Sequence, residues 1–189
     1  MIETLSLLFI HLLINNMRKG QVWVETVIYT LIGLALIGLV LTIVMPKISE
    51  FEDKSTIEQT IDVLNSFDSK VSEVLSAPGN VRKLQLKMRR GVIYVNGENE
   101  TIVYKLGPIT TKYSEIDSSI DIGNVNVITK EFGSEYEVSL LLNFSEYDLA
   151  YDKNSTKNEK FSEVSIPYEF LIENLGVVND KLKIDIRVD

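Results

Sequence analysis

The sequence predicts an α+β protein in which a long N-terminal apolar helix continues as an amphipathic helix and packs on a mainly antiparallel β-sheet. Three features predict this class. Apolar residues are almost continuous before Pro46, recur every three or four positions after it, and alternate with polar residues through much of the remainder. A helix with one apolar stripe and a sheet with one apolar face bury those surfaces against each other. We expect four consecutive parts: a leader (1–20), an apolar helix (21–45), an amphipathic helix (46–77) and a β-rich head (78–189).

The first sixteen residues fit no standard targeting segment. Residues 5–14 are apolar but too few to span a bilayer, which takes about 20. They do not resemble the core of a secretory signal either, because Arg18 and Lys19 follow them and no small-residue cleavage site is present. Two interpretations stay open: Met17 is the true translation start, or the chain has a longer leader that lies in the membrane interface.

A continuous apolar run from Val22 to Met45 predicts a membrane-spanning helix. About 20 apolar residues in helical form cross a bilayer core, so the run is long enough. The cations Arg18 and Lys19 precede it, whereas Lys47 after it is soon outnumbered by acidic residues, namely Glu50, Glu52 and Asp53. The positive-inside rule then places the N-terminus in the cytoplasm and the residues after the run outside. We expect a single-pass protein of the cell membrane with an extracytoplasmic head.

Three N-glycosylation sequons agree with an outer location for the head. They stand at Asn99, Asn143 and Asn154. The first is expected in a hairpin loop, the second near a strand end and the third in a polar loop. Each is a short pattern that often occurs by chance, so the sequons predict surface glycosylation only together with the topology.

The stretch RKGQVWVE, residues 18–25, resembles the class III signal peptide of archaeal type IV pilin-like proteins. In that family a short basic leader ends in glycine, and a membrane-embedded prepilin peptidase cuts after it while the apolar segment stays on the mature chain. The mature chain commonly begins with Gln and has Glu as its fifth residue. Five positions match, at Arg18, Lys19, Gly20, Gln21 and Glu25, whereas Trp23 stands where the family often has a small polar residue. The resemblance covers roughly residues 18–50 and leaves both the subfamily and the head undefined.

The resemblance implies a role for Glu25, the only charge in the apolar run. A carboxylate at the centre of a membrane helix costs about 2.5–3.5 kcal/mol, and less near the interface. In the family, cleavage creates an N-terminal amine, here on Gln21, and this amine pairs with the glutamate of a neighbouring subunit. Gly20 would define the cut and Glu25 would receive the new cation. The alternative is a single-pass anchor in which the sequence RKG at residues 18–20 occurs by chance and the membrane tolerates the carboxylate of Glu25.

Small residues lie on two sides of the apolar helix. One side carries Thr26, Thr30 and Gly33, and the nearly opposite side carries Ala35, Gly38 and Thr42. Small residues let membrane helices approach closely, so such a helix could pack against neighbours on both sides, as a filament core requires. Gly and Thr are also common in membrane helices in general, and the two interpretations have equal weight.

After Pro46, which would kink or end the helix, the pattern predicts the head. The amphipathic helix has a stripe formed by Ile57, Ile61, Leu64, Val71 and Leu75, and it stops at residues 77–80. Residues 91–107 predict a hairpin with Asn96-Gly97 at its turn. Two further strands show clean alternation, at residues 136–144 and at residues 181–188, where we expect Leu182, Ile184, Ile186 and Val188 to point inward.

Composition and motifs exclude several classes of function. The net charge of −8 argues against a nucleic-acid partner, which would need a basic face. Cysteine is absent, which excludes disulfides and cysteine–metal sites, and the single histidine, His11, precedes the predicted head. There is no phosphate-binding glycine loop, no zinc-ligand spacing and no EF-hand spacing. A glycosidase-like acid pair stays open, although surface acids explain the many carboxylates better. Asp148 with Asp152, or Asp117 with Asp121, could share a Ca²⁺ ion, but nothing in their spacing singles them out. We therefore expect no catalytic site, no cofactor and no enzyme activity.

Two hypotheses of function remain. The first is a pilin-like structural subunit, major or minor, whose partners are the membrane, a prepilin peptidase, and copies of itself or other pilin-like subunits. The second is a membrane-anchored extracytoplasmic binding or adhesion module that does not polymerise. An outer-surface hydrolase has no positive residue evidence. Gly20, Gln21 and Glu25 favour the first hypothesis.

Overall fold

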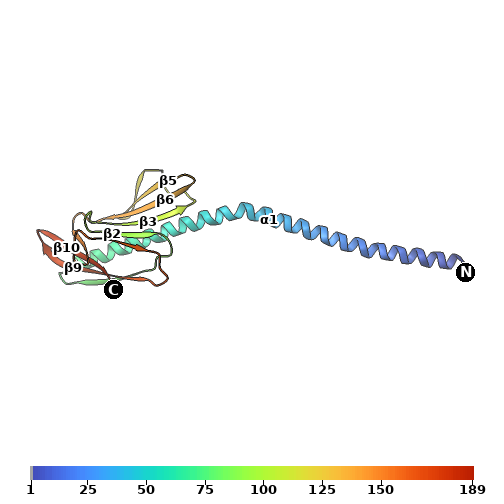
Figure 1. The fold of residues 1–189 in the computed structure, drawn as a ribbon, viewed down its shortest axis with the longest axis horizontal. Helices are drawn as coiled ribbons and strands as arrows, with labels where there is room; N and C mark the ends of the chain where they lie inside the picture. The colour runs from blue at the N-terminus through green and yellow to red at the C-terminus, as the bar shows by residue number, and fades with distance from the viewer. Residues whose placement is uncertain (1) are drawn as a thin grey trace. The chain divides into compact units, whose positions relative to one another are not determined.

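The computed structural model describes the backbone from Ile2 to Asp189 and the side chains of Leu7 and residues 22–189. Within these residues one helix, α1 (Ile2–Val74), precedes ten β-strands (Figure 1). The chain divides into two compact units, residues 1–48 and residues 49–189, and each is described by itself.

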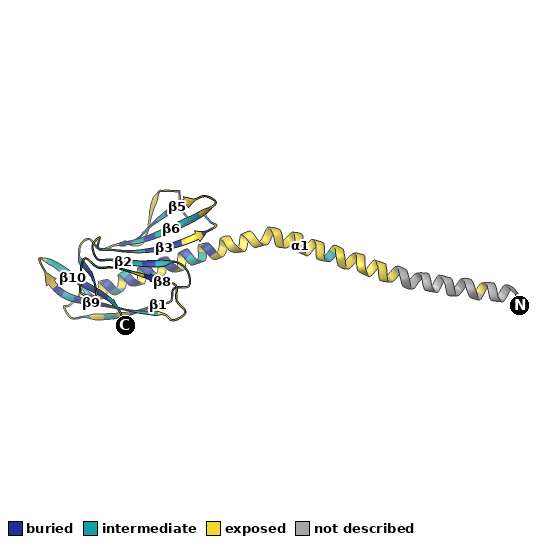
Figure 2. Ribbon diagram, viewed as in Figure 1, coloured by how far each residue is buried: buried dark blue, intermediate teal, exposed yellow. Residues whose placement is uncertain are grey.

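The first unit is helical and presents its apolar side chains outward. Every described residue from Val22 to Ile48 is exposed except Gly33, which is half-buried (Figure 2). Pro46 lies inside α1, so the helix does not end there although a proline removes one backbone donor. The threonine hydroxyls bond to the helix itself: Thr26 Oγ1 donates to the carbonyl of Val22 at 2.9 Å. Such back-bonding satisfies a hydroxyl group without an external partner.

In the second unit, the helix stripe that the sequence predicts is buried. Six apolar residues of α1 are at most 4% exposed: Ile57, Ile61, Leu64 and Val71 of the predicted stripe, with Phe67 and Val74 beside them. Leu75, the fifth residue of the predicted stripe, follows the end of the helix and is half-buried. The helix ends at Val74, close to the expected boundary at residue 77. Asn174 caps this end, because its Nδ2 donates to the carbonyl of Val74 at 2.9 Å. A helix leaves its last carbonyls without intrahelical donors, and Asn174 satisfies one of them.

The strands form two sheets around this helix. A six-stranded antiparallel sheet has the order β4 (Ser119–Ile122), β5 (Val125–Phe132), β6 (Glu135–Asn143), β3 (Thr101–Ile109), β2 (Val92–Asn96) and β8 (Asn158–Ser162). A four-stranded sheet has the order β1 (Val81–Leu86), β9 (Tyr168–Val178), β10 (Lys181–Val188) and β7 (Asp148–Tyr151), with only β10 and β7 parallel. The α+β class is therefore confirmed, but the strands belong to two sheets where the sequence analysis expects one.

The predicted hairpin is present between β2 and β3. Asn96 pairs with Thr101, and residues 97–100 form the turn. Gly97 is required here by space, since a Cβ atom at this position would lie 2.6 Å from the carbonyl oxygen of Ser155. The glycine thus allows the β7–β8 connection to pass close to the turn.

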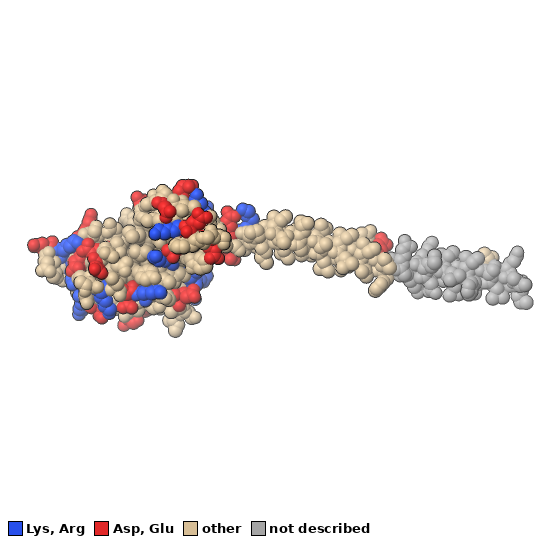
Figure 3. All heavy atoms as spheres, turned by 45° about the horizontal axis from the view of Figure 1, so that its top comes forward, with Lys and Arg blue, Asp and Glu red and all other residues tan. Residues whose placement is uncertain are grey.

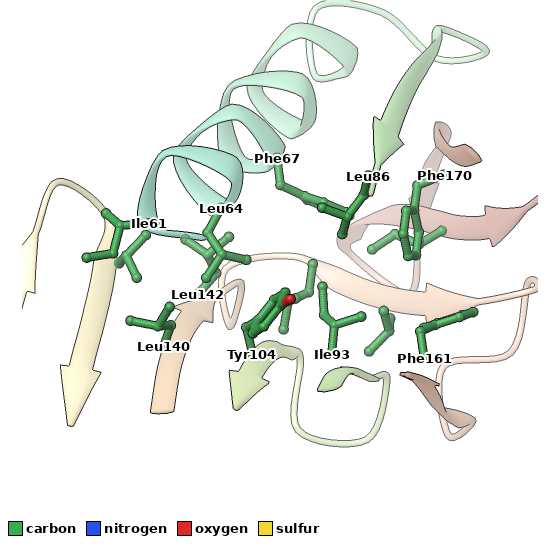
Figure 4. Packing of buried hydrophobic residues seen from close by; sticks show 14 of the residues in the cluster. Ile61, Leu64, Phe67, Leu86, Ile93, Tyr104, Leu140, Leu142, Phe161 and Phe170 are labelled. Atoms are coloured by element: carbon green, nitrogen blue, oxygen red, sulfur yellow. The ribbon is translucent and has the colours of Figure 1, made fainter. Parts of the chain in front are cut away.

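The core of the second unit joins the helix stripe to both sheets (Figure 4). Phe67 of α1 meets Phe170 of β9 edge to face, with ring centroids 5.9 Å apart. The alternation predicted for residues 136–144 is present, because Val138, Leu140, Leu142 and Phe144 are buried. In β10, Ile184 and Ile186 are buried as expected, but Asp185 between them is fully buried as well. Its Oδ1 accepts a hydrogen bond from the backbone N–H of Lys153 at 2.5 Å, and its Oδ2 accepts one from the guanidinium group of Arg187 at 3.3 Å. These two partners explain how a carboxylate is tolerated there.

Candidate functional site: the N-terminal helix and its attachment to the head

The most unusual surface of the protein is the apolar part of α1. Among the described residues, one helix is long and apolar enough to cross a membrane, and none of its apolar window is buried within the chain. Trp23 is 70% exposed and Ile43 is 64% exposed. The core helix of a soluble protein would bury such residues, so this surface is suited to a lipid or protein partner outside the chain. Figure 3 shows Lys, Arg, Asp and Glu atoms over the head and hardly any along this described stretch.

Glu25 is the only charged residue from Val22 to Met45, and it is exposed. No described residue pairs with it. The hydroxyl groups of Thr26 and Thr30 donate to carbonyls of the helix itself. The carboxylate of Glu25 is therefore available to a cation that lies outside the described part of the chain.

The two glycines that the sequence analysis assigns to helix packing have open space where a side chain would begin. A Cβ atom at Gly33 or Gly38 would meet nothing within 4 Å. Neither glycine is needed for a close contact within the chain, so any close approach that they allow is to another molecule. Their assembly role stays a prediction.

The processing site lies outside the residues whose side chains are described. This applies to Arg18, Lys19, Gly20 and Gln21, and to the start at Met17. Cleavage after Gly20 therefore stays a prediction from the sequence.

All three sequon asparagines are exposed on the second unit. Asn99 lies in the β2–β3 turn, Asn143 at the end of β6, and Asn154 in the β7–β8 connection. The side-chain oxygen of Asn154 accepts hydrogen bonds from the backbone N–H and the hydroxyl group of Thr156, both at 2.9 Å. That arrangement leaves the amide nitrogen, the atom that carries an N-linked glycan, without a described partner. The positions suit glycosylation, which stays a prediction.

Asp53 attaches the helix to the strands of the head, a role that the sequence analysis misses. It is 4% exposed. Its Oδ1 accepts a hydrogen bond from the guanidinium group of Arg90 at 2.6 Å, and its Oδ2 accepts from the backbone N–H and the hydroxyl group of Thr110 at 2.7 and 2.8 Å. Arg90 also donates to the carbonyl of Pro108. We call this set of contacts the Asp53 clasp.

The clasp controls the ionisation of its carboxylate. Burial by itself would raise the pKa of Asp53, but the hydrogen bonds from Thr110 and Arg90 outweigh burial and hold this pKa below its usual value. Asp53 is therefore ionised at neutral pH and bound by charge-assisted hydrogen bonds. No sequence signal distinguishes it from its acidic neighbours Glu50 and Glu52, because the partners are 37 and 57 residues away.

The described residues contain no group of three or more His, Asp or Glu side chains that could hold a metal ion. They do contain a surface groove, which lies between α1 and the β1–β2 connection and is lined by Phe51, Ser55, Gln59, Lys87 and Arg89, among others. Among the described residues, every buried polar side-chain atom has a hydrogen-bond partner.

Comparison with known proteins gives no match: no protein-family model, no curated protein and no solved structure is significantly similar to the chain. The class of the protein therefore follows from its own architecture. It is an α+β protein with a long apolar N-terminal helix followed by a β-sheet domain, a layout compatible with that of pilin-like proteins.

Proposed function

We propose that the chain is a pilin-like structural subunit, major or minor, of an archaeal cell-surface filament. In this proposal a prepilin peptidase hydrolyses the peptide bond after Gly20, and the mature subunit assembles through its apolar helix. The observation that carries the proposal is the exposed apolar surface from Val22 to Ile48, with one carboxylate four residues after Gln21.

The membrane is the location of the subunit before assembly. The apolar part of α1 spans the bilayer once, with the N-terminus in the cytoplasm and the second unit outside. During assembly the same helix exchanges lipid for the helices of neighbouring subunits. Glu25 then accepts a charge-assisted hydrogen bond from the new amine on Gln21 of a neighbour, a contact that is strong where water is excluded. Repeated along the filament, this contact sets the axial register.

The test is the N-terminal residue of the mature protein, read by mass spectrometry from native membranes and from sheared surface filaments. We expect a chain that begins at Gln21 in both fractions. A Gly20→Val variant should keep its leader and stay in the membrane, because the bulkier side chain obstructs the cut. A native chain that keeps residues before Gln21 would refute the processing step.

One observation favours a second candidate function, an anchored binding module that does not polymerise. The second unit has its own core and is a compact body without the apolar helix. Such a head could act alone on a single-pass anchor. If the mature chain begins at Gln21 but is recovered only as single subunits in the membrane, this second function replaces the first.

A further inference from the structure

The groove between α1 and the β1–β2 connection combines an aromatic ring with two cations. Phe51 is 74% exposed at one wall. Lys87 and Arg89 are exposed at the other, and among the described residues neither pairs with a carboxylate. Arg90 next to them differs, because it is bound in the Asp53 clasp. Two unpaired cations remain beside the aromatic ring.

A neighbouring loop extends this surface with aliphatic side chains. The backbone N–H of Val164 donates to the carbonyl of Met88 at 3.3 Å, which holds the loop of residues 163–167 beside the groove. Ile166 in this loop is 79% exposed, and Val164 is 36% exposed. We name the combined set of Phe51, Lys87, Arg89, Val164 and Ile166 the basal surface.

Carboxylates next to the basal surface balance its charge. Glu52 lines the groove and Glu163 begins the loop, so two carboxylates accompany the two cations. A net positive field is therefore not what makes this surface distinctive. Its character is amphipathic: exposed Phe and Ile side chains stand next to Lys and Arg, the combination that favours the boundary between lipid and water.

The basal surface is close along the chain to the apolar run. Phe51 follows Met45 by six residues, and α1 is continuous between them. Six helical residues span about 9 Å. The polar layer on each side of a bilayer is about 5–8 Å thick. An upright helix places Phe51 about 9 Å past the end of the apolar run, near the outer edge of the headgroup layer, and a tilted helix brings it into that layer.

We propose that the basal surface docks on the headgroup layer of the membrane that holds the protein's own anchor. This inference rests on the membrane anchoring stated under Proposed function. Phe51 and Ile166 enter the headgroup layer, while Lys87 and Arg89 bind lipid phosphate groups. Docking holds the head of an unassembled subunit against the bilayer, and assembly into a filament releases it.

The chain has no cysteine, so single labels can be placed without background. Ser165 and Ser145 offer a matched pair, because both are exposed serines and they stand at opposite ends of the sheets. The full chain is reconstituted, at low protein density, in vesicles of phosphatidylcholine and phosphatidylglycerol that contain a headgroup-nitroxide lipid. A Ser165→Cys label should be quenched several-fold more strongly than a Ser145→Cys label. Equal quenching at the two positions would overturn the inference.

Two variants identify the groups responsible. On the Ser165→Cys background, Ile166→Ser and the double variant Lys87→Glu, Arg89→Glu should each reduce quenching toward the Ser145 level. Unchanged quenching in both variants would also overturn the inference. If the label instead responds to protein density and not to the nitroxide lipid, the basal surface binds a second copy and the lipid assignment is wrong.

A third label separates this inference from the anchor itself. A Leu36→Cys label lies in the apolar run and should be quenched by nitroxides placed on acyl chains. If Leu36 is quenched while the labels at 165 and 145 behave alike, the docking fails and the anchor stands. If the Leu36 label is not quenched, the membrane anchoring under Proposed function is refuted, and the docking inference that rests on it is refuted as well.

Discussion

Replacing Asp53 with alanine is expected to lower the free energy of unfolding of the head by about 2–4 kcal/mol. The substitution removes the acceptor of the hydrogen bonds from Arg90 and Thr110, at 2.6–2.8 Å. A hydrogen bond to a charged group contributes about 1.5–3 kcal/mol, and a buried group left without a partner costs about 1–3 kcal/mol. Arg90 is 36% exposed, so water replaces part of the hydrogen bonding that it loses. The expected destabilisation is therefore smaller than the summed free energies of three hydrogen bonds to a charged group.

The assay is urea unfolding of residues 49–189, followed by circular dichroism, since this segment contains the whole buried core. Asp62→Ala is the matched control, because Asp62 is an exposed carboxylate on the same helix. We expect the control to change stability by less than about 0.5 kcal/mol. A loss below that value for Asp53→Ala as well would refute the conclusion that the clasp attaches the helix to the strands.

The remaining predictions concern pH, the helix cap, the head and assembly. The pKa of Asp53 is held below its unfolded value, so the contribution of Asp53 to the free energy of unfolding is complete above about pH 4 and is lost as the pH falls through the folded pKa. The difference in stability between the parent and Asp53→Asn should therefore decrease on acidification. A difference that does not depend on pH would contradict this prediction. Asn174→Ala should lower the free energy of unfolding by about 2–3 kcal/mol in the same urea assay, because the carbonyl of Val74 and the N–H of Gly176 both lose a buried partner. A change near zero would show that Asn174 does not stabilise the end of the helix. Residues 49–189 should be monomeric by sedimentation with mixed helix and strand circular dichroism, and persistent aggregation would count against an independent head. Glu25→Gln should leave membrane content and the mature N-terminus unchanged but reduce filament yield in a filament-forming host; normal filaments would remove Glu25 from the mechanism.

The prediction for Glu25 separates insertion from assembly. Glu25 lies on an exposed helix near the start of the apolar run, where a single subunit can keep the carboxylate near the headgroups. Removing its charge slightly lowers the cost of insertion, so a defect confined to filaments would locate its role between subunits. A defect in membrane content would instead show that Glu25 acts in the isolated chain.

The sequence by itself determined the periodic features of this protein. The helix stripe that begins at Ile57 and the alternation in β6 report which side of an element is apolar, and the structure confirms both. The continuous apolar run from Val22 to Met45 predicts a helix, which the structure shows, with its apolar side chains exposed. The hairpin turn after Asn96 was also predictable, because Asn-Gly is a strong local turn signal. Local pattern is sufficient in these cases since each depends on residues within one element.

Only the tertiary structure decided how the elements are joined. Alternation shows which face of a strand is buried but not which strand lies next to it, so two sheets could not be distinguished from one. The same limit hid Asp53, whose partners are on distant strands, and Asn174, which caps a helix 100 residues earlier in the chain. Strand alternation places Asp185 on the face opposite Ile184 and Ile186, yet it is fully buried, and its partners are the backbone N–H of Lys153 and the guanidinium group of Arg187. A buried polar residue is stabilised by partners that the fold brings to it, and a local pattern carries no record of those partners.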